Sequence, residues 1–565
     1  AYTAAVGKFG SSALGENQDV VLENDKVIIT IASKGAMIKS VQLKGFKTNS
    51  GDSLFLMKND PQNEMTLDFF AGNNAVSTKN LYFAYTGASK LSATEGNPAK
   101  AVFRANVDSN SWLEFNYELR DGFLLDYNIV LHNLDNIVNR NTSTLDLSWN
   151  QFLPILETGN MWEKRNSDLC FKYADDDAES LGGTVGGWFS GGSSDAKDEI
   201  LSTPTKWIAY KGQFFSSICI ARTTFQSAEV AMQPIEANGN LKFMSSTIHV
   251  PANVSEHQMV WYFGPNQYKV LDDIELEEGD KLDLGDLVPL GGWFLGTINR
   301  YLIIPFFNFL GTLFDSYGII ILILTITVKA VLFPLTYKSY KSSAAMRVLK
   351  PQMDEINKKY PRQEDAMKKQ QAVMELYQKA GISPIGGCLP MLLQMPILIA
   401  LFRFFPASIE LRQQSFLWAS DLSSFDSVLD LPFSIPFYGD HVSLFALLMS
   451  IAMIVQTKIT SGQMDTGAMP GMKLMLYFMP VMMLFWFNDY ASGLTYYYLL
   501  SNIIAILQIV LVRNNIDEKA ILDKLNAKVA KNSGKKKSGW LARLEEAQRR
   551  QMEMMKEQEK KKKKK

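Results

Sequence analysis

One basic residue lies inside an otherwise apolar stretch of the sequence. Lys329 stands about twelve residues into the segment that begins near Tyr317. A cation at that depth in a membrane-spanning helix costs several kcal/mol unless it meets water or a polar partner. Two explanations stay open. Either the ammonium faces a hydrated cavity and offers a positive site to acidic groups, or the side chain extends to the membrane surface, because Lys338 is only about 13 Å further along the helix.

Polar side chains recur in the other apolar segments. Thr325 lies one helical turn before Lys329, and Gln394 places an amide in a second apolar segment. The last apolar segment carries two neighbouring polar stripes, Tyr497 with Ser501 and Gln508, and Tyr498 with Asn502. Such side chains either bond neighbouring helices together or line a wet cavity. On the residues alone, helix-to-helix bonding is favoured for Thr325, Ser501 and Asn502.

Residue types that suit catalysis or metal binding are sparse. The three cysteines, Cys170, Cys219 and Cys388, have no CxxC or other metal-like spacing. A disulfide between the first two is compatible with an extracytoplasmic domain, although spacing cannot decide it. The first 285 residues hold three histidines without a convincing acid and base pair, namely His132, His249 and His257. We therefore expect no enzyme activity, no cofactor and no metal.

The polar residues must be positioned by long apolar helices. Five segments after residue 315 are each near the length that crosses roughly 30 Å of hydrocarbon as a helix, although the fourth is short. They cover about residues 317–337, 388–406, 442–460, 471–487 and 494–512. Residues 315–513 are thus predicted to form an α-helical membrane domain with five spans.

Charge is sorted along the chain although its total is close to zero. The connection 338–381 carries ten Lys or Arg against five Asp or Glu, and the tail 514–565 carries seventeen against eight. With five spans these two segments fall on one side of the membrane, and the acidic loop 410–440 falls on the other. Because basic loops stay in the cytoplasm, the domain before the spans is expected in the periplasm.

Residues 286–314 are ambiguous. They are apolar, but Arg300 lies near their middle and several glycines and Pro305 interrupt them. A sixth span here would move the preceding domain to the cytoplasm. Trp293 and Tyr301 suit the headgroup region, so we favour an amphipathic helix that lies on the outer membrane surface.

The first half of the chain is predicted to be a soluble β domain. Residues 20–285 contain short β-rich runs separated by Gly, Asn, Asp and Ser, as in DKVIITIASKGAMIKSVQLKGF. This pattern indicates a large antiparallel sandwich. The small and polar residues 1–19 are expected to form a flexible linker.

The basic connection 338–381 carries two apolar stripes at helical spacing, one on each side of Pro361. The first includes Met346, Leu349 and Met353, and the second includes Val373 and Leu376. Two short helices folded on one another would bury both stripes and expose Lys and Arg. The resulting hairpin is either a plain connector or a docking device.

Several long motifs resemble the YidC/Oxa/Alb family of membrane protein insertases. The runs GIIILILTITVKAVLFPLTYKSYKSSAAMRVLKPQMDEI, GISPIGGCLPMLLQMPILIALF and MKLMLYFMPVMMLFWFNDYASGLTYYYLLSNIIAILQ match the family's core in order across residues 318–508. The first half, including GPNQYKVL at residues 264–271, resembles the large periplasmic domain of the Gram-negative type. Members of this type also have an amino-terminal signal-anchor helix, and we expect the sequence as given to be processed or incomplete at its start.

The resemblance implies a periplasmic β-supersandwich and five core helices around a hydrophilic groove that opens to the cytoplasm. Nascent membrane proteins would enter this groove and pass into lipid, alone or with the Sec translocon. The implied groove residues are Lys329, Thr325, Gln394, Tyr497, Tyr498, Ser501 and Asn502. The family usually has Arg where this chain has Lys329, so the planar fork that binds carboxylates in two places is missing.

The Lys-rich tail has two candidate partners. In this family extended basic tails contact the ribosome, where rRNA phosphate would bind them, and the signal recognition particle system would deliver substrates. Anionic membrane lipid is the rival partner.

Two other functions remain open. A secondary transporter or channel could use Lys329 in a solute path, although inverted repeats are not evident. A carbohydrate enzyme is the second alternative, because β-supersandwiches resemble mutarotase-like domains.

Overall fold

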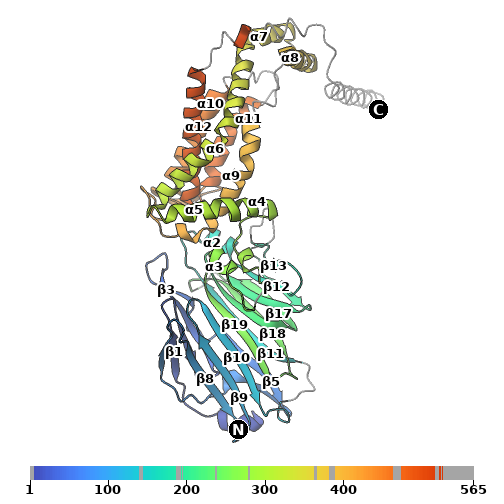
Figure 1. Ribbon diagram of the computed structural model, residues 1–565, viewed down its shortest axis with the longest axis vertical. Helices are drawn as coiled ribbons and strands as arrows, with labels where there is room; N and C mark the ends of the chain where they lie inside the picture. The colour runs from blue at the N-terminus through green and yellow to red at the C-terminus, as the bar shows by residue number, and fades with distance from the viewer. Residues whose placement is uncertain are drawn as a thin grey trace, which may run out of the picture. The chain divides into compact units, whose positions relative to one another are not determined.

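The computed structural model describes most of the chain (Figure 1), and the described residues fall into two compact units. The described residues are 6–138, 144–185, 192–193, 195–235, 238–277, 280–361, 366–380, 389–461, 472–515, 521–523 and 525. The first unit takes in residues up to 325 with 395–450 and 482–500, and the second takes in 326–394, 451–481 and the residues from 501 onward.

Three sheets build the β domain of the first unit. Their strand orders are β4 (Ser53–Met57), β3 (Met37–Lys47), β2 (Val27–Ala32), β1 (Asp19–Glu23) and β7 (Lys90–Ser92) in the first sheet. The second sheet runs β13 (Ala178–Ser180), β12 (Asp168–Tyr173), β15 (Thr205–Lys211), β16 (Phe215–Phe225), β19 (Glu256–Pro265), β10 (Leu124–His132), β9 (Trp112–Leu119) and β8 (Ala99–Asn106). The third runs β14 (Lys197–Leu201), β17 (Ser227–Pro234), β18 (Asn240–Pro251), β11 (Thr144–Pro154), β5 (Glu64–Ala71) and β6 (Asn74–Ser77).

Strand burial explains why the sheets stack. In β8 and β10 buried residues alternate with more exposed ones, as expected for strands with one face on the core. The central strand β19 is buried along nearly its whole length, so both of its faces are covered. Trp149 of β11 stacks on Tyr210 of β15 with ring centroids 3.5 Å apart, which joins the third sheet to the second. The predicted all-β domain is confirmed.

The amino-terminal segment differs from the linker that we expected. Residues Gly7–Ser12 form a 3-10 helix, η1, and Phe9 within it is fully buried. The Phe9 ring meets Phe69 of β5 edge-on at 5.5 Å. Val6 and Ala13 are buried in the same core, and the Ser11 and Ser12 hydroxyls donate to the Asn106 carbonyl oxygen, so the segment is attached at several points, with Phe9 contributing about 1.5–3 kcal/mol.

The two cysteines of the β domain are buried and unpaired. Cys170 of β12 lies opposite Ala209 of β15. Cys219 of β16 lies opposite Ile208, which precedes Ala209 on β15. One whole strand therefore separates them, a distance of roughly 10 Å. A disulfide needs α-carbons within about 7 Å, so the disulfide that the sequence left open does not form in this fold.

The apolar half of the chain is helical. The long apolar helices are α6 (Tyr317–Val348), α9 (Leu389–Ala407), α10 (Leu444–Ser461), α11 (Met472–Phe487) and α12 (Ser492–Asn514). By length and hydropathy α6 and α12 could each cross a membrane, and shorter apolar runs occupy Gln394–Ala407, Leu444–Thr460 and Tyr477–Phe487. Helix α6 does not stop at Tyr337, where we expected its span to end, but continues past the internal Pro334 to Val348.

Residues 293–311 form an amphipathic helical run in the first unit. It consists of α4 (Trp293–Ile298), a π turn (Asn299–Ile303) and α5 (Ile304–Gly311). Its buried residues recur every four positions at Leu295, Asn299, Ile303 and Phe307. Asn299 donates to the carbonyl oxygen of Ala400 in α9, at 2.9 Å. The amphipathic pattern is present, and the membrane-surface location remains a prediction.

The basic connection folds as a helical pair in the second unit. Helix α7 (Lys350–Lys359) contacts α8 (Ala366–Ala380), and the Tyr377 hydroxyl lies 3.2 Å from the Met353 sulfur. Leu349 and Ala380 are fully buried in a small cluster with Leu525. The apolar stripes are thus used to hold the two helices together.

A buried ion pair fastens the β domain to the segment that follows α9. Arg412, just after the 3-10 turn Ile409–Leu411, donates from Nε to both carboxylate oxygens of Glu157 at 2.8 Å. A second guanidinium nitrogen donates to the Lys47 carbonyl oxygen at 2.6 Å, and the group lies over the Phe215 ring. The side chains of Arg412 and Glu157 are only 3% and 6% exposed. The pair therefore fixes the β domain against the ends of the helices within this unit.

Removing one member of this pair should destabilise the first unit strongly. Arg412→Ala would leave the buried Glu157 carboxyl group without its cation, and breaking a buried pair in this way typically costs about 3–5 kcal/mol. We expect the free energy of unfolding to fall by the same amount. It is measured by proteolysis of the full chain at increasing denaturant concentration. Lys26→Ala is the matched control, because Lys26 and Asp25 form a pair whose side chains are 49% and 59% exposed. If both variants lose the same stability, the buried pair does not hold the junction.

A second carboxyl group at this junction keeps its proton. Glu163 of α2 (Asn160–Asn166) is buried, and its two oxygens accept hydrogen bonds from the backbone nitrogens of Leu156 and Glu157. Burial raises the pKa of Glu163 to about 8, and the adjacent Glu157 carboxylate raises it as well. Protonated Glu163 thus accompanies the Arg412–Glu157 pair without a second negative charge.

Stability of the first unit should fall as the pH rises. An unfolded Glu163 loses its proton near its ordinary pKa of 4.5, whereas the folded residue keeps it up to about pH 8. The folded state is therefore penalised progressively between these values. Glu163→Gln should flatten this dependence, measured as the melting temperature of the full chain in detergent near pH 6 and above pH 8. An unchanged pH dependence in the variant would contradict the assignment of the proton to Glu163.

Candidate functional site

Lys329 lies on α6 in the second unit and points at a neighbouring helix. Its side chain is only 6% exposed, and Nζ donates to the side-chain oxygen Oε1 of Gln394 on α9 at 3.3 Å. The ammonium is therefore held across the helix bundle and does not extend along α6 toward Lys338. Snorkelling, one of the two explanations that the sequence left open, does not describe this side chain.

A chain of polar contacts continues from Lys329 across three helices. The Gln394 amide nitrogen donates to the Ser501 hydroxyl on α12 at 3.4 Å. Gln508, two turns further on α12, donates to the backbone oxygen of Lys329 at 3.5 Å. These contacts are long for hydrogen bonds, which indicates weak bonds that a competing polar group could replace. Lys329, Gln394, Ser501 and Gln508 are hereafter the Lys329 cluster.

The ammonium of the Lys329 cluster has no negative partner. Within the part of the chain that the structure describes, no carboxylate forms an ion pair with Lys329, and its one side-chain acceptor is a neutral amide. An ammonium has three donor hydrogens. The cluster therefore carries a net positive charge and spare hydrogen-bonding capacity in an otherwise apolar set of helices.

The other predicted site residues have different surroundings. Thr325 is fully buried and donates to the Ile321 carbonyl oxygen of its own helix at 2.6 Å. In the first unit the Tyr497 ring packs on Phe405, and the Tyr498 ring packs on Phe487. Asn502, in the second unit, has a buried amide nitrogen with no acceptor among the described residues.

Gln508 was not among the predicted groove residues, and the buried ion pair of Arg412 and Glu157 was not predicted from the sequence. Gln508 shares a face of α12 with Ser501, and its spacing of seven residues was the signal that could have identified it. Arg412 was counted only as a charge, although it is the one basic residue in the acidic loop 410–440. A lone cation there was the sequence signal for its buried partner.

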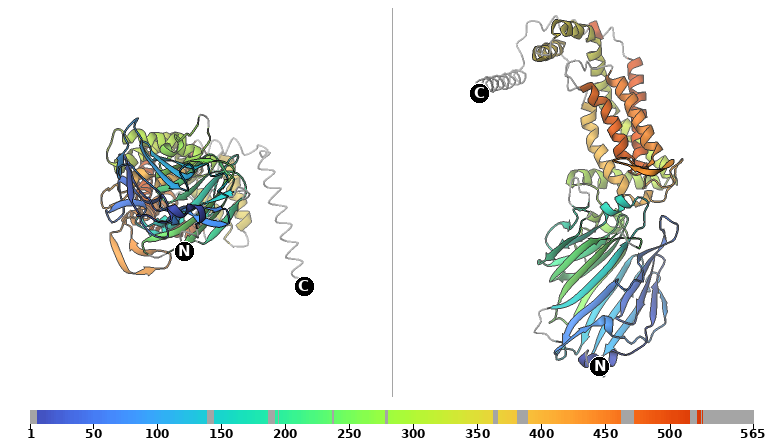
Figure 2. Two further views of the ribbon diagram at one scale, coloured as in Figure 1. Left: turned by 90° about the horizontal axis from the view of Figure 1, so that it is seen from below. Right: turned by 180° about the vertical axis from the view of Figure 1, so that it is seen from behind.

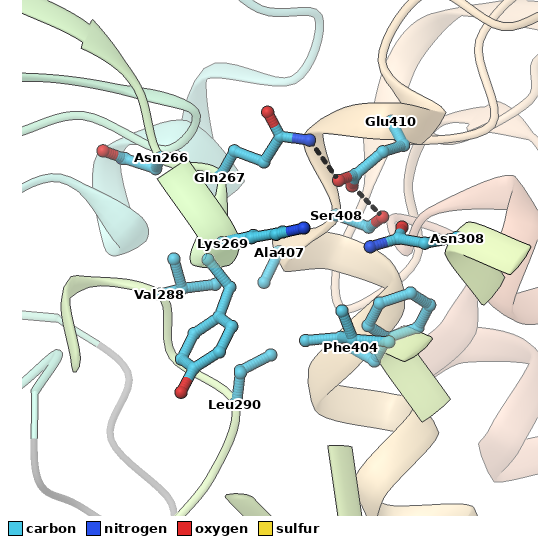
Figure 3. Close-up of a pocket in the computed structure, with 12 residues that line it drawn as sticks. Asn266, Gln267, Lys269, Val288, Leu290, Asn308, Phe404, Ala407, Ser408 and Glu410 are labelled. Carbon is cyan, nitrogen blue, oxygen red and sulfur yellow. Dashed lines mark hydrogen bonds between the residues drawn. The ribbon is translucent and has the colours of Figure 1, made fainter. Parts of the chain in front are cut away.

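A small polar crevice lies in the first unit, between the segment around α3 (Tyr268–Asp272), α5 and the end of α9 (Figure 3). Glu410 accepts hydrogen bonds from Gln267 at 3.1 Å and from Ser408 at 2.7 Å. Lys269 and Asn308 reach into the same space. Its polar groups already bond the β domain to the segment after α9, so we interpret the crevice as part of the junction rather than as a binding site.

Comparison with known proteins gives matches along both halves of the chain. Residues 309–519 match the family described as 60Kd inner membrane protein, and residues 19–304 match the YidC periplasmic domain. The membrane protein insertase YidC of Parabacteroides distasonis is 43% identical over 97% of this chain and 85% of its own length. The protein of the same name from Bacteroides fragilis strain ATCC 25285 is 42% identical, with coverages of 96% and 86%.

One solved structure is described as an active YidC insertase with the first transmembrane domain resolved. It is 18% identical, covers 88% of this chain and 93% of its own, and has a TM-score of 0.34. The family assignment depends on the sequence relatives, which match nearly the whole chain at about 40% identity. The two family matches cover the β domain and the apolar helices in turn. This chain therefore belongs to the YidC family of membrane protein insertases.

Proposed function

We propose that the Lys329 cluster is the polar lining of a substrate groove through which this insertase of the bacterial inner membrane passes segments of nascent membrane proteins. The observation that carries the proposal is the state of Lys329: its ammonium is buried among apolar helices, faces an amide and has no carboxylate partner in the described residues. A cation in that position is costly, which marks it as a candidate functional residue. Thr325, Tyr497, Tyr498 and Asn502 are proposed to extend the same lining.

The proposed mechanism requires no bond chemistry. Acidic residues in the short translocated part of a substrate would be drawn to the ammonium, because charges attract strongly where water is scarce. The substrate's apolar segment would meanwhile move along apolar helix surfaces into lipid. Val331 of α6 and Met475 of α11 are 71% and 68% exposed and belong to such surfaces. Burial of about 20 apolar residues would supply the driving force.

The proposed arrangement in the membrane has five spans. We place the β domain and the loop 410–440 in the periplasm, the run of α4 and α5 on the outer membrane surface, and the pair α7 and α8 with the tail 514–565 in the cytoplasm. Support comes from the sorted charges, since the connection between α6 and α9 and the tail are the basic segments. Most of the tail lies outside the described residues.

Partners beyond nascent membrane proteins follow from the same arrangement. The basic pair α7 and α8 and the basic tail suit the ribosome or anionic lipid, and the Sec translocon and the signal recognition particle system are proposed as cooperating machinery. We propose no enzymatic activity. The relatives are named as insertases, so a solute transporter that uses Lys329 has no support.

Neutralising Lys329 should impair insertion selectively. Lys329→Ala should lower insertion of substrates with acidic translocated segments by roughly 5- to 30-fold, the factor that 1–2 kcal/mol corresponds to. Substrates with neutral translocated segments should be affected much less, and Lys329→Arg should retain insertion because the charge remains. The measurement is protease protection of substrates made in the presence of vesicles that contain each variant.

Lys338→Ala is the matched control for this experiment. Lys338 lies on the same helix but is exposed, so its loss should not distinguish the two classes of substrate. Equal insertion of acidic and neutral substrates by Lys329→Ala would show that the Lys329 cluster only bonds helices together.

The proposed topology can be tested separately from the groove. Protease added to spheroplasts should cleave the β domain while the α7 and α8 pair stays protected until the membrane is opened. The reason is that five spans place these two parts on opposite sides. Protection of the β domain in intact spheroplasts would require a sixth span in residues 286–314.

A further inference from the structure

A β hairpin interrupts the segment between α9 and α10. Strand β20 (Leu429–Ile435) pairs with β21 (Gly439–Val442), and α10 begins two residues after β21 ends. The hairpin projects sideways from the helix ends and lies at the same level of the first unit as α4 and α5 (Figure 2). The paired length, from Gly439 to Val442 of β21, is roughly 10 Å.

Strand β21 and the turn before it are held against the helix ends. The His441 ring is buried and stacks on Phe425 with centroids 3.8 Å apart. The side-chain nitrogen of Asn488, between α11 and α12, donates to the carbonyl oxygens of Tyr438 in the turn and of His441 in β21, at 2.8 and 2.9 Å. The hairpin is therefore fixed with respect to the helix ends of this unit.

Strand β20 exposes apolar side chains. Its sequence alternates Leu429, Leu431, Phe433 and Ile435 with other residues, and its pairing with β21 is irregular between Asp430 and Ile435. Leu429 and Phe433 are 57% and 61% exposed. A two-stranded hairpin is marginally stable in water, and an exposed apolar face marks an interaction surface.

The tip carries the most exposed aromatic side chain of the hairpin. Phe437 is 94% exposed, and its backbone φ of +67° lies in the left-handed region, which Gly or Asn adopts more readily. A turn that served only to reverse the chain would favour one of those residues. A bulky aromatic at this position indicates that its side chain has a partner outside the fold.

Lipid fits this surface better than a protein partner does. Two separate elements of the first unit, the hairpin and the helix α4, expose large apolar side chains at one level, and Trp293 of α4 is 86% exposed. A planar surface accounts for both. The next residues of the chain enter α10, an apolar helix of a membrane protein. No Lys or Arg occurs between Arg412 and Lys458, so attachment would depend on apolar burial rather than on headgroup charge.

We propose that the β20–β21 hairpin is a lateral membrane anchor, which inserts Leu429, Phe433 and Phe437 into the boundary between headgroups and acyl chains at the β-domain end of the helices. The proposal requires only that α10 crosses the membrane. It does not depend on the Lys329 cluster or on which side of the membrane the β domain lies.

Spin labels on the hairpin and on the β domain test the proposal. Phe433→Cys and Asp25→Cys would be made separately in the full chain with Cys170, Cys219 and Cys388 replaced by Ala, and Asp25 is the control because its side chain is 59% exposed in the β domain. After reconstitution into vesicles of phosphatidylethanolamine and phosphatidylglycerol, collisions with oxygen and with a water-soluble nickel complex are compared. The label at position 433 should collide with oxygen severalfold more than with nickel, and the label at position 25 should show the reverse.

The substitution Phe437→Asn provides a second, independent test of the anchor. Asn accepts the left-handed backbone, so the turn should form at least as well as before. The label at position 433 should nevertheless move toward the aqueous pattern, because Phe437, a further anchoring side chain besides the labelled position, is gone. Vesicles of phosphatidylcholine alone should give the same pattern as the anionic mixture.

Two results would overturn the anchor. Aqueous exposure of the label at position 433 in vesicles would show that no lipid meets this face. Exclusion of both oxygen and nickel from that label would show that protein, either a second copy of this chain or another partner, covers it instead.

Discussion

Hydrocarbon offers no hydrogen-bond partner to a polar group, and the arrangement of this insertase depends on that constraint. The apolar half of the chain is helical because a helix satisfies its own backbone groups. The same constraint makes Lys329 conspicuous, since among the described residues its ammonium has only the Gln394 oxygen as a side-chain acceptor. A cation that the surrounding protein solvates so poorly suits a site that awaits a charged guest rather than one built for stability.

Outside the apolar helices, buried charged groups are stabilised by an oppositely charged partner. Arg412 and Glu157 are at least as inaccessible as Lys329, yet they neutralise one another with two bonds of 2.8 Å. The adjacent Glu163 avoids a second uncompensated charge by keeping its proton, as its raised pKa of about 8 indicates. The two sites therefore differ: the Arg412 guanidinium has a carboxylate partner at the junction, whereas the Lys329 ammonium has none among the described residues, which supports the role proposed for the Lys329 cluster.

Exposed apolar surface is the complementary feature of the first unit. Trp293 and Phe437 would be unfavourable in water, yet each belongs to an element that is otherwise well packed, α4 through Leu295 and the hairpin through His441. One face of each element packs against the rest of the first unit, and the other face is exposed. The proposed outer-surface helix and the proposed hairpin anchor would together give the β domain a fixed position above the lipid.

The sequence by itself determined the division into a β domain and an apolar helical half, the sorting of charge, and the exceptional place of Lys329. These are properties of composition and short-range periodicity, which need no knowledge of distant contacts. The family followed from long motifs. Only the tertiary structure decided what depends on residues far apart in the chain: that Phe9 helps to hold its segment to the core, that a whole strand separates Cys170 from Cys219, and that Lys329 turns to Gln394 rather than to the surface. Such contacts depend on strand order and helix packing, which local patterns do not specify.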